Sequence, residues 1–96
     1  MLETDAERRH TEAAARLWIV RLIEAYEAAR AAAIRAGAAD YPRLRREWDA
    51  AANRLALALR GRGECYRHGS HVYGADRITG ELTRASAPRT PSRRDP

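Results

Sequence analysis

Two long segments with helical periodicity lie close together in this chain, and only the four residues GAAD separate them. A linker of this length makes two consecutive helices fold back on each other as an antiparallel hairpin. We expect the first helix over residues 5–36 and the second over residues 41–60. The sequence therefore predicts a mainly α fold whose first unit, residues 1–61, is a helical hairpin.

The ends of both predicted helices carry recognisable signals. Thr4 and Glu7 have the spacing of a capping box at the start of the first helix, and Gly37 is expected to end it in a left-handed conformation. Asp40 is expected to be the N-cap of the second helix, and Gly61 is expected to end it. These signals predict the bounds of the hairpin.

Apolar residues repeat at helical spacing in both segments, and this indicates how the hairpin packs. In the first segment the stripe consists of Ala15, Trp18, Ile19, Leu22, Tyr26, Ala29 and Ala33. In the second, with the alternating spacing of three and four that is typical of coiled coils, it consists of Tyr41, Leu44, Trp48, Ala51, Leu55 and Ala58. We interpret the four aromatic residues as core side chains that fill the volume left by the alanines.

The first helix also carries apolar residues outside this stripe. Leu17 and Val20 project from the opposite face, so the helix is apolar almost all round over residues 17–23. At 1.5 Å per residue the first helix is about 48 Å long and the second about 30 Å, so the hairpin leaves one end of the first helix uncovered. We expect Leu17 and Val20 to dock a protein partner or a second copy of the chain, unless the C-terminal segment covers them.

The remainder of the chain differs from the hairpin. Residues 62–84 are expected to form a small turn-rich unit in which HVY and ELT are short strands joined by the loop GADRITG. From Arg84 onward the chain has three prolines, four arginines and no bulky apolar residue, so residues 85–96 are expected to form a disordered basic tail. The predicted fold is thus a helical hairpin followed by a β-hairpin-like unit.

The stretch ECYRHGSHVYG contains the only cysteine and two of the three histidines. Cys65, His68 and His71 are candidate zinc ligands, because a thiolate and two imidazoles suit that ion; Asp76, His10 or a water would have to complete the shell. With the turn DRITGE this cluster resembles half of a zinc ribbon that lacks its second cysteine pair. The same side chains do not make a visible nucleophilic site, since no orienting group or oxyanion pocket accompanies them. We therefore expect no enzymatic activity.

Charge is distributed unevenly along the chain. All 18 basic residues are arginine, which reflects a GC-rich genome as much as function, and the net charge is +5. Residues 1–40 have six arginines and seven acidic residues, whereas residues 41–96 have twelve arginines and six acidic residues. This asymmetry favours contact with a polyanion, mainly through backbone phosphates. The candidate nucleic-acid-binding residues are Arg43, Arg46, Arg54, Arg60, Arg62, Arg67, Arg89, Arg93 and Arg94.

Two hypotheses on function follow from these features. The first is a non-enzymatic interaction protein that self-associates or docks a partner through Leu17 and Val20 and contacts nucleic acid through its arginines. The second is a small zinc-binding module built on Cys65, His68 and His71. A single cysteine and an N-terminus without the basic-then-apolar order of a signal peptide predict a cytoplasmic protein, and the apolar runs are too short for a membrane span. We favour the first hypothesis because it uses most of the chain.

Overall fold

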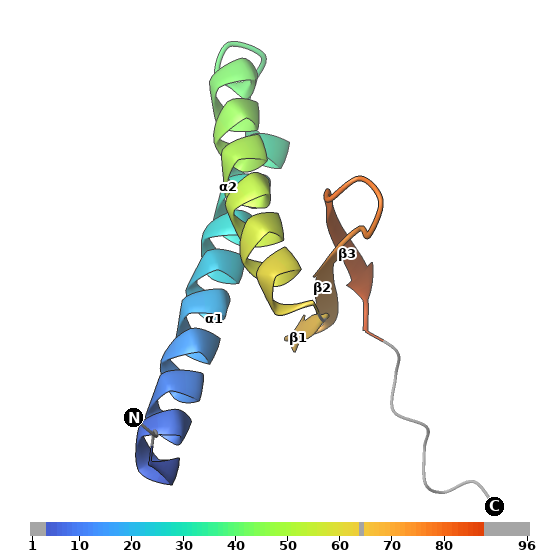
Figure 1. Ribbon diagram of the computed structural model, residues 1–96. Coiled ribbons are helices and arrows are strands. Elements are labelled where there is room, and N and C mark those ends of the chain that lie inside the picture. The colour runs from blue at the N-terminus through green and yellow to red at the C-terminus, as the bar shows by residue number, and fades with distance from the viewer. Residues whose placement is uncertain (1–3, 64, 88–96) are drawn as a thin grey trace, which may run out of the picture.

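The computed structural model describes residues 4–63 and 65–87, which form two helices followed by a small sheet (Figure 1). Helix α1 spans Asp5–Arg35 and helix α2 spans Tyr41–Arg62, and the two run antiparallel along each other. The predicted helical hairpin is confirmed. No helix among these residues is both long and apolar enough to cross a membrane.

A three-stranded antiparallel sheet follows the hairpin, in the order β1, β2, β3. Its strands are Tyr66–His68 (β1), His71–Ala75 (β2) and Leu82–Ser86 (β3). The predicted pair of strands corresponds to β2 and β3, whereas β1 was not predicted. Strand β1 pairs with β2 through the two-residue turn Gly69–Ser70, in which Gly69 has the positive φ of 63° that such turns require. Because it has only three residues, β1 shows no alternating pattern in the sequence.

The ends of α1 differ in how well they were predicted. The capping box at its start is confirmed, since the backbone N–H of Glu7 donates to Thr4 Oγ1 at 3.1 Å and the N–H of Thr4 to Glu7 Oε2 at 3.4 Å. The left-handed stop at Gly37 is wrong. The helix ends because Ala36 adopts an extended conformation with ψ of 147°, and the Gly37 carbonyl then accepts the N–H groups of Asp40 and Tyr41.

The predicted start of α2 is confirmed, and its predicted end needs correction. Asp40 is the N-cap residue, although its backbone is helical and its side chain makes no capping hydrogen bond. At the other end the helix continues through Gly61 to Arg62, and Gly63, at φ of 69°, terminates it by donating to the Leu59 carbonyl at 3.0 Å. A glycine inside a helix is tolerated at modest cost, so the helix runs to the glycine at which the chain turns away.

The sheet extends past residue 85, where we predicted that the C-terminal tail begins. Strand β3 continues through Ser86, and the backbone N–H of Ala87 donates to the Ser70 carbonyl at 2.8 Å. Residues 85–87, which we had placed in the tail, therefore belong to the sheet or contact it. The rest of the predicted tail, residues 88–96, lies outside the described residues.

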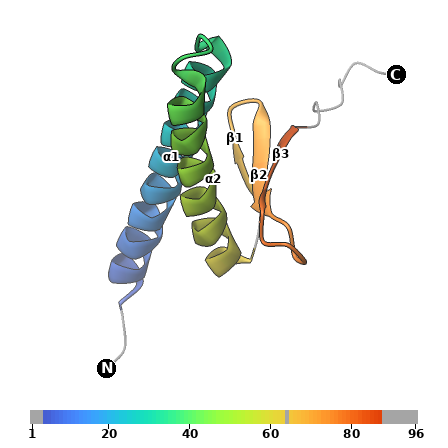
Figure 2. The ribbon, with the colours of Figure 1, turned by 90° about the horizontal axis from the view of Figure 1, so that it is seen from above.

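The core lies where α1, α2 and the sheet meet. Figure 2 shows the sheet alongside α2, and Tyr73 of β2 is the sheet residue that enters the core. The buried core cluster consists of Ile19, Leu22, Ile23, Tyr26, Ala51, Leu55, Leu59 and Tyr73. Tyr26 and Tyr73 meet edge to face, with ring centroids 6.3 Å apart.

Two of the four aromatic residues predicted for the core are not in it. Trp18 is 59% exposed and Tyr41 is 41% exposed, whereas Tyr26 is buried and Trp48 is half-buried. Successive residues of a helix are about 100° apart around its axis, so Trp18 lies at the edge of the stripe when Ile19 faces the core.

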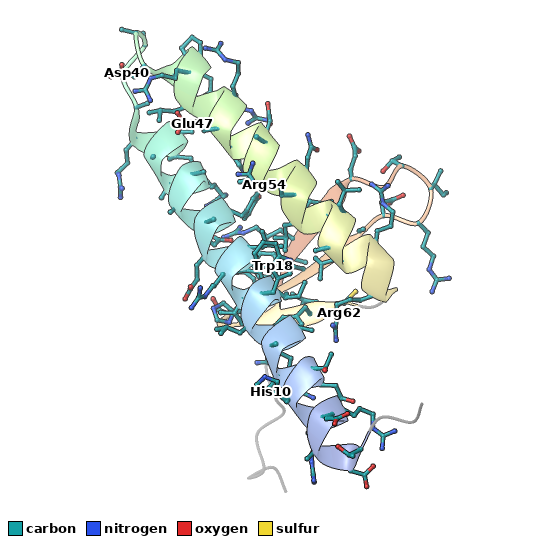
Figure 3. The ribbon with its side chains drawn as sticks, turned by 60° about the vertical axis from the view of Figure 1, so that its left-hand side comes forward. His10, Trp18, Asp40, Glu47, Arg54 and Arg62 are labelled. Carbon is teal, nitrogen blue, oxygen red and sulfur yellow. The ribbon has the colours of Figure 1, made fainter. Side chains whose placement is uncertain are left out.

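The two helices differ in length, as expected. With 31 and 22 residues, α1 and α2 measure about 46 Å and about 33 Å, and the N-terminal part of α1 extends beyond α2 (Figure 1). Figure 3 shows His10 on this extension. Between residues 4 and 16 only Ala15 is half-buried, and the others are exposed. The extension is mostly polar and is not covered by the C-terminal unit.

Candidate interaction surfaces

The face of α1 that points away from α2 and the sheet carries an exposed apolar patch. Ala14, Leu17, Trp18 and Arg21 line a shallow depression of about 200 Å³, and we call these four residues the α1 outer patch. Leu17 is 51% exposed, and Trp18, which Figure 3 marks on α1, is 59% exposed. Their spacing of three, one and three residues places them on one side of the helix.

The two residues predicted to bind a partner differ in exposure. Leu17 is exposed, as that prediction requires, whereas Val20 is half-buried and lies nearer the packed side of the helix. Trp18, which we had placed in the core, occupies the surface position next to Leu17. Leu17 and Trp18 thus place two large, about half-exposed apolar side chains next to each other on α1.

The arginines of α2 do not form one continuous cationic stripe. Arg43 lies 3.2 Å from Glu47 and 3.8 Å from Asp40. Arg60 donates from Nη2 to the Gly80 carbonyl at 2.9 Å, so it holds a loop of the sheet. Ion pairs and a loop contact thus occupy part of the predicted nucleic-acid-binding set.

The other members of that set differ from one another in their surroundings. Arg46 and Arg54 are exposed on α2, and in the described part of the chain no carboxylate forms an ion pair with either. Figure 3 shows Arg54 on α2 and Arg62 at its C-terminal end. Arg67 is exposed in the middle of β1. The remaining predicted residues, Arg89, Arg93 and Arg94, lie outside the described residues.

The three candidate zinc ligands lie on two faces of the sheet. His68 pairs directly with His71, and both share the face of Tyr73, which packs against the helices. Cys65 lies on the other face: a Cβ placed on Gly74 would be 3.0 Å from Cys65 Sγ and 3.2 Å from Thr83 Oγ1. A spacing of three residues places Cys65 and His68 on opposite faces because side chains alternate along extended chain, whereas the turn between β1 and β2 brings His68 and His71 together.

The other groups proposed to complete a zinc site are engaged or remote. Asp76 Oδ1 accepts the backbone N–H groups of Ile78 at 2.8 Å and Thr79 at 2.9 Å, and these bonds hold the pKa of Asp76 below its ordinary value. His10 lies on the N-terminal extension of α1. Within residues 4–63 and 65–87, no three His, Cys, Asp or Glu side chains are arranged to hold a metal ion. Zinc binding therefore gains no support from this geometry and stays a prediction.

A polar cluster that the sequence did not indicate joins the sheet to α1. Glu27 accepts hydrogen bonds from Tyr73 Oη at 2.6 Å, from Arg84 Nε at 2.6 Å and from Arg84 Nη2 at 3.0 Å. Tyr73 and Arg84 are cross-strand partners on β2 and β3, so they present both donors to one carboxylate. We call these three residues the Glu27 cluster.

The Glu27 cluster has perturbed acidities with clear causes. Partial burial by itself would raise the pKa of Glu27, but the hydrogen bonds from Arg84 and Tyr73 and the charges of Arg84 and Arg30 outweigh it, so the pKa is lowered. Burial, the hydrogen bond to Glu27 and the negative charge of Glu27 raise the pKa of Tyr73 to about 12. The contact with Glu27 raises the pKa of Arg84. At neutral pH Glu27 is therefore charged and Tyr73 is protonated.

The arrangement of the Glu27 cluster indicates a structural role. Each of its donors is directed at the same carboxylate, and the described residues leave no buried side-chain nitrogen or oxygen without a hydrogen-bond partner. The surfaces that remain for function are the α1 outer patch, the arginines of α2 and a cleft beside the β2–β3 loop. Comparisons with protein-family models, curated proteins and solved structures found no significant match to this chain.

Proposed function

We propose that this chain is a non-enzymatic interaction protein that self-associates through the α1 outer patch. The observation that carries the proposal is the exposure of two large apolar side chains next to each other, Leu17 at 51% and Trp18 at 59%. Full burial of a large apolar side chain stabilises by roughly 1.5 to 3 kcal/mol, and because each of these side chains is about half exposed, a partner that covers it would recover about half of that. We infer that a second copy of the chain covers them.

The spacing of exposed residues along the same face of α1 favours a helix of the second copy as the element that covers the α1 outer patch. Ala14, Trp18, Arg21, Ala25 and Ala28 follow one another at alternating intervals of four and three residues, and all five are exposed. This is the spacing that lets two helices pack along a shared seam. The alanines allow close approach, while Trp18 and the neighbouring Leu17 supply most of the apolar area.

The distribution of charge supports a second copy as the partner. Residues 1–40 have six arginines and seven acidic residues, while residues 41–96 have a surplus of six arginines. Two copies that meet through α1 bring nearly neutral regions together and keep their basic regions apart. Contact between the regions after residue 40 of two copies would bring two surpluses of positive charge together, which is unfavourable.

Sedimentation equilibrium of two matched variants tests this proposal. Leu17→Glu puts a charge into the α1 outer patch, and Leu57→Glu puts the same charge on α2, where Leu57 is 60% exposed. We expect the wild type and Leu57→Glu to associate and Leu17→Glu to be monomeric at the same concentration. A monomeric wild type, or equal association of both variants, contradicts the proposal.

A second candidate function, contact with nucleic-acid phosphates, is favoured by the absence of ion-pair partners for Arg46 and Arg54 within the described residues. Self-association through α1 would leave α2 open to such contact. Fluorescence anisotropy with a DNA duplex over a range of salt concentrations tests it. Replacing both residues with Gln should reduce the slope of log affinity against log salt by about two.

The control for this second test is Arg43→Gln, because Arg43 already pairs with Glu47. We expect this variant to change the salt dependence less than either Arg46→Gln or Arg54→Gln does. An unchanged slope in the Arg46 and Arg54 double variant would show that other groups contact the phosphates, or that no specific contact exists.

A further inference from the structure

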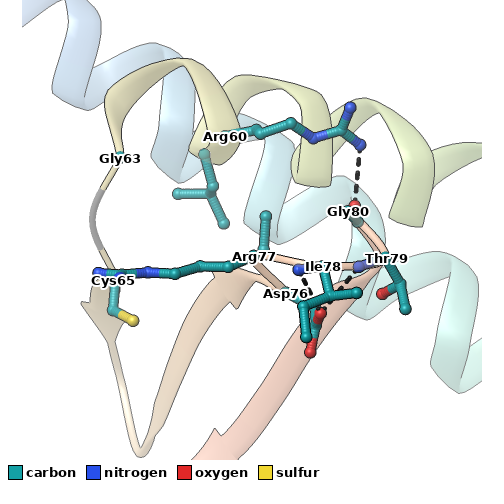
Figure 4. A pocket seen from close by; sticks show the side chains of 10 residues that line it. Arg60, Gly63, Cys65, Asp76, Arg77, Ile78, Thr79 and Gly80 are labelled. Carbon is teal, nitrogen blue, oxygen red and sulfur yellow. Dashed lines mark hydrogen bonds between the residues drawn. The ribbon is translucent and has the colours of Figure 1, made fainter.

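A cleft of about 550 Å³ lies between the C-terminal end of α2 and the loop that joins β2 to β3 (Figure 4). This volume falls within the range of small-molecule sites, which is about 300 to 1,000 Å³. The cleft is remote in sequence from the α1 outer patch, and none of its lining residues belongs to α1. It is therefore a separate surface from the one assigned to self-association.

Hydrogen bonds hold the wall of this cleft in place. Asp76 Oδ1 accepts the N–H groups of Ile78 and Thr79, and the Gly80 N–H donates to the Asp76 carbonyl at 2.9 Å. Arg60 of α2 donates to the Gly80 carbonyl at 2.9 Å and so ties the loop to the helix, as the dashed lines in Figure 4 show. A pre-ordered wall lowers the entropic cost of binding a ligand.

The close contact between Arg60 and the β2–β3 loop requires glycine at position 80. Its φ is 76°, and a Cβ at this position would lie 2.5 Å from Arg60 Nη2. Only glycine combines that conformation with the close approach of the guanidinium. The loop geometry and the position of Arg60 at the cleft thus depend on each other.

The lining combines an apolar floor with cationic groups. Leu59, which is 1% exposed, and Ala75 provide the apolar part, and Ile78, which is 94% exposed, stands at the rim. Arg60 and Arg77 both line the cleft, and Arg77 makes no hydrogen bond or ion pair within the described residues. Among the described lining residues Asp76 is the one carboxylate, and it already accepts two backbone N–H groups.

We propose that this cleft binds a small organic carboxylate that carries an aliphatic group. Guanidinium groups recognise carboxylates through paired, charge-assisted hydrogen bonds, and an aliphatic group fits the floor formed by Leu59 and Ala75. Arg77 supplies the charge that is free to bind, while Arg60 keeps the loop in place through its hydrogen bond to Gly80. An inorganic anion would satisfy Arg77 but would make no apolar contact with Ala75 or with the exposed Ile78 at the rim.

Titration of ¹⁵N-labelled protein, followed by amide chemical shifts, tests the proposal with three probes. N-acetyl-L-leucine has both the charge and the aliphatic group, its primary amide lacks the charge, and acetate lacks the aliphatic group. We expect N-acetyl-L-leucine to shift the amides of Ile78, Thr79 and Gly80 in a saturable way at millimolar concentration. The amide and acetate should each bind at least about tenfold more weakly, because each loses one part of the contact.

Two variants assign the charge to a residue. Arg77→Gln should weaken binding of N-acetyl-L-leucine about tenfold, while Arg35→Gln, which removes an exposed arginine at the end of α1, should leave binding unchanged. The spectrum of each variant without probe shows whether it is folded. The proposal is overturned if no probe shifts these amides, if the neutral amide binds as tightly as the acid, or if Arg77→Gln and Arg35→Gln bind equally well.

Discussion

The inner and outer faces of α1 contain similar apolar side chains in different surroundings. Ile19, Ile23 and Tyr26 on the inner face are 2%, 0% and 6% exposed, whereas Leu17 and Trp18 on the outer face are 51% and 59% exposed. The difference is due to what covers each face, since α2 and the sheet pack only on the inner side. The inner face forms the core with α2 and the sheet, whereas Leu17 and Trp18 remain exposed among the described residues.

The largest expected effect comes from a truncation on the inner face. Ile23→Ala leaves a cavity at a fully buried position, so we expect it to lower the free energy of unfolding by about 2 to 5 kcal/mol. Urea denaturation followed by circular dichroism measures the change. A loss smaller than about 1 kcal/mol would mean that the inner face is not the packed core described above.

The second-largest effect is expected from Glu27, on the side of α1 that faces the sheet. Glu27→Gln removes the charge that both Arg84 and Tyr73 contact, so we expect a loss of about 1 to 3 kcal/mol in the free energy of unfolding at neutral pH. Glu24→Gln is the matched control, because Glu24 is an exposed glutamate on the same helix. Equal losses in the two variants would show that the Glu27 cluster does not join the sheet to α1.

The contribution of Glu27 to the free energy of unfolding should also depend on pH in the acid range. The pKa of Glu27 is lower in the folded state than its ordinary value of 4.5, so the folded state favours the ionised form. Its contribution is therefore present above pH 4.5 and is lost as the pH falls through the lowered pKa. Between neutral and acid pH, urea denaturation should show a smaller loss of stability for Glu27→Gln than for the wild type.

We expect a smaller change in the free energy of unfolding in the alkaline range, where Tyr73 ionises. Its pKa is raised from 10.0 to about 12, so the folded state favours the protonated phenol. The stability that this group contributes is present below pH 10 and is lost as the pH rises toward 12. Tyr73→Phe should cost about 0.5 to 1.5 kcal/mol at neutral pH and should remove this part of the alkaline loss. An alkaline profile identical to that of the wild type would contradict the assignment.

The smallest effect is expected on the outer face. Leu17→Ala should change the free energy of unfolding by less than about 0.5 kcal/mol in dilute protein, because Leu17 is 51% exposed there. At high protein concentration the wild type should gain stability through association, and Leu17→Ala should gain less. Thermal melts at several concentrations measure both effects. A large loss in dilute protein would mean that Leu17 belongs to the monomer core.

Short-range signals explain why some features could be predicted from the sequence. The capping box of Thr4 and Glu7 needs residues only three positions apart, and the HVY and ELT strands are joined by one loop. The Glu27 cluster had no such signal, since Glu27 lies 46 residues from Tyr73 and 57 from Arg84. The zinc hypothesis assumed that close sequence spacing means closeness in space, but Cys65 lies on the opposite face of the sheet from His68.

The sequence by itself determined the helical hairpin and the β2–β3 pair, because caps, helical periodicity and short linkers act between neighbouring residues. The tertiary structure decided which side of α1 is covered. It placed Trp18 on the surface and Tyr73 in the core, brought Arg84 to Glu27, and formed the cleft between Arg60 and the loop at Gly80. These features depend on how the sheet docks on the hairpin, and that docking is the sum of many weak contacts between residues far apart in the chain.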